Sequence, residues 1–196
     1  LHDALPIFMS NLCSEILQPQ EPSKLNADLN YKQVGTDISC NLGSMNMVNL
    51  MKSSDFGKSI EYAVRALTTV TDQVHIEEVP TVSKGNALYH TIGLGAMGLH
   101  TALALNGLDY ESEEALEFVD AFFLAMNYYT LKASHQIAVE KSEAFHDFES
   151  SHYADGTYFD KYLEKDFEFQ FDKVNEIFKQ ISLPTVSDWQ QLKEDI

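Results

Sequence analysis

Four side chains near the N-terminal end of the sequence have types and spacing suited to thiol chemistry. Asn11, Cys13 and Glu15 alternate in the stretch NLCSEI, and Cys40, the other of the two cysteines, follows in DISCNLGS. Alternate residues of an extended segment project to the same side, so Asn11, Cys13 and Glu15 are expected to converge on one volume. That volume would hold a carboxamide, a thiol and a carboxylate.

Spacing alone leaves several interpretations of these residues open. Cys13 can be a buried small residue beside a solvated Glu15, as in a helical interaction domain with passive cysteines. Cys13 and Cys40 can instead form the disulfide of a thiol redox module. Hydrolytic thiol catalysis normally needs a histidine to generate the thiolate, and NLCSEI contains none. Redox or radical chemistry fits better, because a thiol to which a radical is delivered can abstract a hydrogen atom, while a carboxylate removes a hydroxyl proton and an amide orients the substrate.

The composition bounds the class of protein. The chain has 196 residues, of which 44% are hydrophobic and 22% charged, as in ordinary globular domains. Its 13 basic and 30 acidic residues give a net charge of -17, which argues against nucleic-acid binding. No apolar run is long enough to cross a membrane and no signal peptide is recognisable, so a cytoplasmic protein without a membrane partner is expected. Two cysteines do not make a disulfide framework.

Apolar spacing predicts a mostly extended or irregular first part and a chain that becomes helix-rich toward its C-terminal end. Residues 8–50 have mostly irregular or extended character, and helical spacing predicts one helix over 60–74 and a longer one from Ser112 to Ile137. The stretch 86–97 predicts a buried strand that leads into a helix ended by Gly107. The residues expected to be buried are Ile60, Ala63, Val64, Leu67, Val70 and Val74 in the first helix, and Ala115, Leu116, Phe118, Val119, Phe122, Phe123, Met126, Ala133 and Ile137 in the second.

Two further helical regions are predicted near the C-terminal end. The aromatic and acidic residues of 158–181 are typical of amphipathic helices with a solvated acidic face. Ser187 is the predicted cap of a last helix whose apolar positions begin with Trp189 and Leu192.

Other short motifs are weaker signals. Gly93 to Gly98 reads G-x-G-x-x-G, but no second strand with an acidic residue follows about 20 residues later, so close backbone packing is favoured over a dinucleotide site. The DFG at 55–57 lacks other kinase motifs. His90, His100 and His135 have no metal-ligand spacing, so no metal site is expected.

Three stretches together resemble a known family. NLCSEI, DISCNLGSMNMVNL and HTIGLGAMGLHTALA are similar to the large, catalytic alpha subunit of class I ribonucleotide reductase, most like class Ib, and the resemblance extends from residue 8 to 196. It implies that 8–196 is a partial barrel domain, a fragment of the ten-stranded α/β barrel of these subunits. Leu1–Ile7 resembles a translated sequencing adapter and is predicted to be an artefact, so the chain is expected to be an internal fragment.

The resemblance also implies a role for each candidate residue. Cys13 would form the transient thiyl radical that abstracts the 3' hydrogen of a ribonucleoside diphosphate. Glu15 would deprotonate the 3' hydroxyl, and Asn11 would hydrogen-bond the ribose hydroxyls. Cys40 would be half of the redox-active dithiol, and its partner cysteine is absent from this sequence.

Cofactors and partners are implied by the same resemblance. The fragment would bind no cofactor itself, whereas the parent enzyme depends on a dimetal-tyrosyl radical, with Mn or Fe, in a separate small beta subunit. A thioredoxin- or glutaredoxin-like reductant would restore the dithiol. The full-length chain would form a homodimer, and the fragment alone is expected to be inactive.

Overall fold

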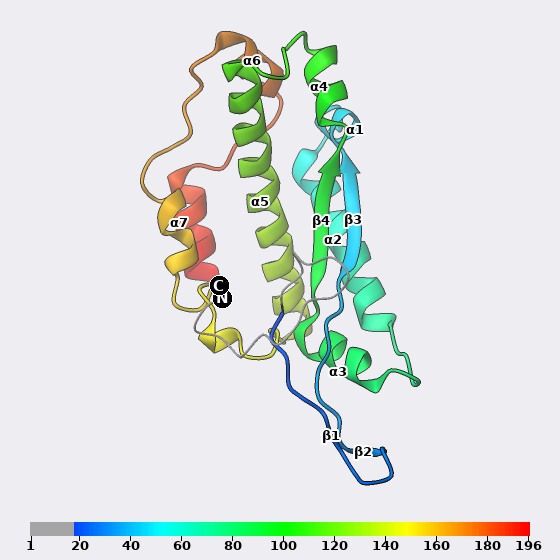
Figure 1. The fold of residues 1–196 in the computed structure, drawn as a ribbon. Coiled ribbons are helices and arrows are strands. Elements are labelled where there is room, and N and C mark those ends of the chain that lie inside the picture. The colour runs from blue at the N-terminus through cyan, green and yellow to red at the C-terminus, as the bar shows by residue number, and fades with distance from the viewer. Residues whose placement is uncertain (1–17) are drawn as a thin grey trace. The chain divides into compact units, whose positions relative to one another are not determined.

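The computed structural model describes residues 18–196 (Figure 1). These residues divide into two compact units. Of the described residues, the first unit comprises 18–43, 66–93 and 144–151. The second unit comprises residues 44–65, 94–143 and 152–196. The chain passes between the units within two strands and one helix, and also in the segments after residues 143 and 151.

A small hairpin and one helix shape the first unit. Strands β1 (Lys24–Leu25) and β2 (Tyr31–Gln33) pair antiparallel, and Leu29 reverses the chain between them with a φ of 64°. Helix α3 (Pro80–Tyr89) begins with a proline, whose missing N–H is unneeded in the first turn, and ends where His90 adopts a φ of 48°. The short 3-10 helix η1 (Phe148–Ser150) also belongs to this unit.

The two longer strands are neighbours in one sheet. Strand β3 (Asn41–Asn46) lies beside β4 (Ile92–Met97), and their arrows point in the same direction in Figure 1. The predicted strand over 86–97 is therefore wrong in its first half, because residues 86–89 form the last turn of α3. A short apolar run does not distinguish a strand from a buried helical turn, and Pro80 starts a helix there.

Helix α2 (Phe56–Gln73) matches the predicted helix closely and begins four residues earlier. Ile60 and Val64 are fully buried, as expected, but Val70 is 47% exposed and Thr71 is buried in its place. The DFG motif is the start of this helix, because Oδ1 of Asp55 accepts a hydrogen bond of 2.8 Å from the backbone N–H of Lys58.

The second unit is built around the long helix α5 (Glu113–Lys141). Ser112, where the predicted helix begins, caps it by accepting from the backbone N–H of Ala115 at 3.2 Å. Most of the predicted stripe is buried, with Phe118 and Phe122 at 0% exposure, whereas Leu116 (59%) and Phe123 (44%) are exposed, contrary to expectation. The short helices α1 (Met47–Met51) and α4 (Leu99–Leu105) pack together in the same unit.

The C-terminal region is less helical than its pattern predicts. Only the 3-10 helix η2 (Thr157–Tyr162) and helix α6 (Asp172–Phe178) form within 158–181. Helix α7 (Val186–Asp195) buries Trp189 and Leu192 as expected.

The cap of α7 is Thr185 and not Ser187. The Thr185 hydroxyl accepts from the N–H of Asp188 at 3.2 Å, and the Asp188 carboxylate accepts from the N–H of Thr185 at 2.8 Å. This reciprocal capping box satisfies two backbone N–H groups at once, which explains why the helix starts two residues before the predicted position.

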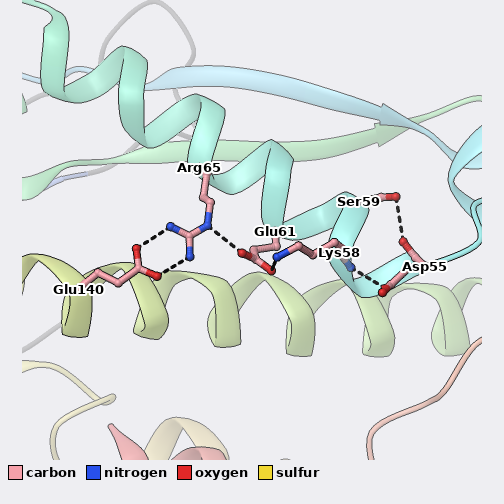
Figure 2. Close-up of polar contacts among 6 residues, drawn as sticks. All are labelled: Asp55, Lys58, Ser59, Glu61, Arg65 and Glu140. Carbon is pink, nitrogen blue, oxygen red and sulfur yellow. Dashed lines mark hydrogen bonds and ion pairs between the residues drawn. The ribbon is translucent and has the colours of Figure 1, made fainter.

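An ion-pair network joins α2 to α5 within the second unit (Figure 2). Arg65 donates two hydrogen bonds of 2.7 Å to Glu140 and a third of 2.8 Å to Glu61, which also accepts from Lys58 at 2.7 Å. The guanidinium of Arg65 holds the pKa of the Glu140 carboxyl below its usual range. The paired, planar geometry fixes the facing sides of these two helices more firmly than a single contact.

The structure confirms a mixed helix and strand content but not a closed barrel. Residues 18–196 contain two sheets of two strands each, whereas barrel closure requires every strand to be paired on both edges. Within the same range, no helix combines the length and the apolar character needed to span a membrane.

Candidate functional site

Only one of the four predicted site residues lies in the part of the chain that the structure describes. Asn11, Cys13 and Glu15 fall within residues 1–17 and are outside the described range. Their expected convergence, and their distance from Cys40, therefore stay predictions. Cys40 can be examined directly, and its surroundings define the candidate site.

Cys40 is half-buried and immediately precedes β3. A Cβ atom on Gly93 would lie 3.1 Å from the sulfur of Cys40 and 2.5 Å from Cδ2 of Leu42. Cys40 and Leu42 are thus on the same face of the strand, and the missing side chain of Gly93 leaves them room. Leu42 is 64% exposed, so this face is open in the described part of the chain.

The opposite face of the same segment packs against helices α2 and α3. A Cβ on Gly43 would lie 3.4 Å from the side chain of Leu67, an ordinary contact distance. A Cβ on Gly85 of α3 would lie 2.2 Å from the carbonyl oxygen of Asp37, so α3 approaches the backbone before Cys40 very closely. Residues 39, 41 and 43 therefore face the helices while Cys40 and Leu42 face away.

A polar network connects the helices to both neighbours of Cys40. Oδ1 of Asn86 accepts from the Ser39 hydroxyl and from Nδ2 of Asn41, each at 3.3 Å. Nδ2 of Asn41 also donates to the Thr71 hydroxyl at 2.7 Å. Nδ2 of Asn86 donates to the carbonyl of Thr71 at 2.5 Å. Asn86 and Thr71 are only 3% and 2% exposed, so these bonds form away from bulk water.

A second amide holds the same strand from the N-terminal side. Gln18 donates from Nε2 to the carbonyl of Ser39 at 2.5 Å, and its Oε1 accepts from the N–H of Ser39 at 3.2 Å. This paired contact mimics the hydrogen bonding of a neighbouring strand. The contact links Ser39, which precedes Cys40, to Gln18, which follows Cys13 by five positions in the sequence.

Nearby charged residues tie α3 to the segments around the hairpin. Lys84 of α3 contacts Glu21 at 2.9 Å and donates to the carbonyl of Val34 at 3.0 Å, joining the helix to the segments that flank the hairpin. The hydrogen bond from Lys84 lowers the pKa of the Glu21 carboxyl. Burial raises the pKa of Tyr89, at the end of the same helix.

The glycines of the G-x-G-x-x-G motif permit close packing beside β3 and the turn that begins α4. Gly93 admits Cys40 and Leu42, and Gly98 begins α4 with a φ of 83°, a conformation that residues with a Cβ avoid. This agrees with the interpretation that favoured backbone packing over dinucleotide binding.

Histidines and acidic residues do not gather into a metal site in residues 18–196. His90 lies 3.3 Å from Asp72, and the ring of His100 contacts the ring of Tyr110. A cavity of about 670 Å³ lies beside α5, but the amide of Asn127 in its wall is already hydrogen-bonded to the hydroxyls of two tyrosines. Cys40 and its network therefore remain the best-defined candidate site.

Sequence reasoning did not identify the residues of this network. Asn41, Thr71 and Asn86 were available only as isolated polar positions next to apolar ones, which is a weak signal. Thr71 lies one helical turn after Leu67, but the predicted apolar stripe continues through Val70 and Val74, so no break in the pattern marked Thr71 as a buried polar position.

Comparisons with known proteins point to one family. The family described as ribonucleotide reductase, barrel domain, matches residues 2–196. The ribonucleoside-diphosphate reductase subunit alpha of Bacillus subtilis is 43% identical over 187 residues, covering 95% of this chain and 27% of the relative. The subunit alpha of Mycoplasma genitalium is 43% identical over 196 residues, covering 97% and 27%, and that of Treponema pallidum is 36% identical, covering 83% and 21%.

These matches establish the family of the chain, which corresponds to only a part of each relative. The chain spans about a quarter of the length of these curated relatives. The family match nevertheless covers nearly the entire sequence, including Cys40, the glycine motif and the long helix. The chain therefore belongs to the ribonucleotide reductase family, as a part of the barrel domain of the large subunit.

Proposed function

We propose that this chain carries the thiol chemistry of a ribonucleoside-diphosphate reductase alpha subunit, which converts ribonucleoside diphosphates to deoxyribonucleoside diphosphates. The observation that carries the proposal is the 43% identity over 95% of the chain to the Bacillus subtilis protein of that name. The N-x-C-x-E motif supplies the residue types that such a reaction needs.

Three residues of the motif act on the ribose. Cys13, as a thiyl radical, abstracts the 3' hydrogen, and the same sulfur later returns a hydrogen to that carbon. Glu15 takes the proton of the 3' hydroxyl, which promotes loss of the 2' hydroxyl as water. Asn11 hydrogen-bonds the ribose hydroxyls and orients them.

Cys40 supplies reducing equivalents together with a partner cysteine outside this chain. The two thiols give up two electrons and two protons and form a disulfide, so that the sum is ribonucleotide plus dithiol to deoxyribonucleotide, disulfide and water. The open face beside Gly93 supports this role, because a substrate and a second cysteine can reach the sulfur only from a side that the helices do not cover.

Other subunits complete the reaction. Cys13 receives its radical from a separate small beta subunit, in which a dimetal-tyrosyl centre holds manganese or iron. A thioredoxin- or glutaredoxin-like protein reduces the disulfide by thiol exchange. The full-length alpha chain acts as a homodimer, of the class Ib type.

The test uses the full-length protein with its small subunit and two substitutions. Cys13→Ser should abolish both tritium release from 3'-labelled CDP and dCDP formation, because the O–H bond of serine is too strong for a protein radical to break readily. Cys40→Ser should retain tritium release and lose dCDP formation, because the first hydrogen abstraction does not need the dithiol. CDP binding, measured by equilibrium dialysis, should be unchanged in both.

Repeated turnover of Cys40→Ser with dithiothreitol would remove Cys40 from the reaction. Mass spectrometry after mild oxidation provides a second check. An intramolecular disulfide between Cys13 and Cys40 in the intact protein would instead favour a thiol redox module.

A further inference from the structure

The two residues that flank Cys40 are held by one buried side chain. Ser39 and Asn41 project to the same face of the extended segment, and both donate to Oδ1 of Asn86 at 3.3 Å. Because side chains alternate along an extended chain, fixing positions 39 and 41 on one face directs position 40 to the other. The direction of Cys40 is thus set through its two neighbours, which Asn86 holds on the opposite face of the segment.

A carboxamide is well suited to this position. Its oxygen has two lone pairs, which accept from Ser39 and Asn41, while its NH₂ donates to the carbonyl of Thr71 at 2.5 Å. The Thr71 hydroxyl accepts from Asn41 and donates to the carbonyl of Leu67 at 3.1 Å. Each named group has a partner, so the network resists rotation of any single member.

On the open face, Gly93 limits the space immediately beside the sulfur of Cys40. The 3.1 Å between Cys40 Sγ and a Cβ position on Gly93 leaves room for a glycine but little more. A thiol that must meet both a substrate and a second cysteine has to keep its place, because a disulfide forms only when the two Cα atoms are about 4.4 to 6.8 Å apart. The buried network on the face of Ser39 and Asn41 and Gly93 on the face of Cys40 together define the position of the sulfur.

We propose that Asn86 is a positioning residue for the Cys40 thiol, acting through Ser39 and Asn41. The inference rests on the proposed redox role of Cys40 and adds the residue that holds it. Asn86 acts on the second half of the reaction, the delivery of reducing equivalents, and not on the first hydrogen abstraction by Cys13.

The experiment compares Asn86→Ala with wild type in the full-length protein with its small subunit. A displacement of about 1 Å in a reacting group can cost on the order of 100-fold in rate. We expect dCDP formation to fall by about 10- to 100-fold, while tritium release from 3'-labelled CDP stays within about threefold of wild type. Parallel loss of both signals would overturn the proposal, since a general structural defect affects every step.

A double substitution separates positioning from simple stability. Because Cys40→Ser already loses dCDP formation, the double variant is read by tritium release alone, which should stay at the level of Cys40→Ser if Asn86 acts through Cys40. A fall of about tenfold or more in tritium release on adding Asn86→Ala to Cys40→Ser would contradict the assignment, because Asn86 would then affect the first hydrogen abstraction. Asn106→Ala is the matched control, because Asn106 also donates from its side chain to a backbone carbonyl, that of Ala102 at 2.8 Å, but ends α4 in the second unit.

Ser39→Ala keeps the proposal testable if Asn86→Ala does not fold. It removes one arm of the network and leaves the buried amide in place, so a smaller loss of dCDP formation with normal tritium release is expected. Unchanged dCDP formation in Ser39→Ala, with Asn86→Ala unfolded or equally active, would refute positioning by this network. The proposed function fails separately, if Cys40→Ser itself turns over repeatedly.

Discussion

Gly85 is the point at which α3 approaches the backbone before Cys40 most closely. A Cβ added there would lie 2.2 Å from the carbonyl oxygen of Asp37, whereas carbon and oxygen atoms normally approach to about 3.3 Å. Gly85→Ala must therefore push the helix and this segment apart by about 1 Å. The displacement strains the hydrogen bond from the N–H of Asp37 to the carbonyl of Thr81, now 3.0 Å, and the contact between Asn86 and Ser39.

The expected cost follows from opposing contributions. Overpacking of this kind costs about 1 to 3 kcal/mol, and each weakened hydrogen bond about 1 kcal/mol. Alanine regains about 1 kcal/mol because it favours a helix more than glycine does. We therefore expect Gly85→Ala to destabilise the packing of α3 on the Asp37 segment by about 2 to 4 kcal/mol.

Hydrogen exchange measured by mass spectrometry on the full-length protein reports this loss locally. A tenfold change in an equilibrium corresponds to about 1.4 kcal/mol, so peptides covering 37–41 and 80–89 should exchange roughly 30- to 1,000-fold faster. Gly43→Ala is the matched control, because its Cβ would lie 3.4 Å from the flexible side chain of Leu67. That variant should change stability by less than about 0.5 kcal/mol.

Near-wild-type exchange in Gly85→Ala would refute the reasoning, because it would mean that the helix and the segment are not in rigid contact. Equal effects of Gly85→Ala and Gly43→Ala would refute it too. In that case any added methyl group, and not the collision with Asp37, would explain the change.

Two other predictions concern Glu15 and Tyr153. Glu15→Gln in the full-length protein removes the proposed base but keeps the size of the side chain, so dCDP formation should fall by about 10²- to 10⁴-fold while alkylation of Cys13 stays at the wild-type rate. Wild-type dCDP formation would exclude Glu15 as the base. Burial raises the pKa of Tyr153 to about 12 in the folded protein. The neutral form of the side chain therefore stabilises the fold fully below the unfolded pKa of about 10. This contribution is lost as the pH rises toward 12. Denaturant titrations should show wild type losing stability relative to Tyr153→Phe between about pH 10 and 12, and identical pH profiles would contradict the assignment.

The positions of the main helices were predictable from local pattern. Apolar spacing and Ser112 located α5, and the same spacing located α2, because helix periodicity and capping depend on residues within a few positions of each other. The errors at Val70 and Leu116 have a different origin. A stripe shows which residues could be buried, but the elements that actually cover the helix decide which of them are.

The candidate site was likewise predictable from the sequence only in part. The sequence by itself identified the family, because short stretches with a specific order of residue types carry it, and it supplied Cys40 and the N-x-C-x-E motif as the predicted site. Only the tertiary structure showed that Asn86 and Thr71 hold the neighbours of Cys40. Asn41 and Asn86 are 45 residues apart, and their hydrogen bond exists only because α3 packs against the segment that leads into β3. Such a contact depends on long-range packing, which no local pattern encodes.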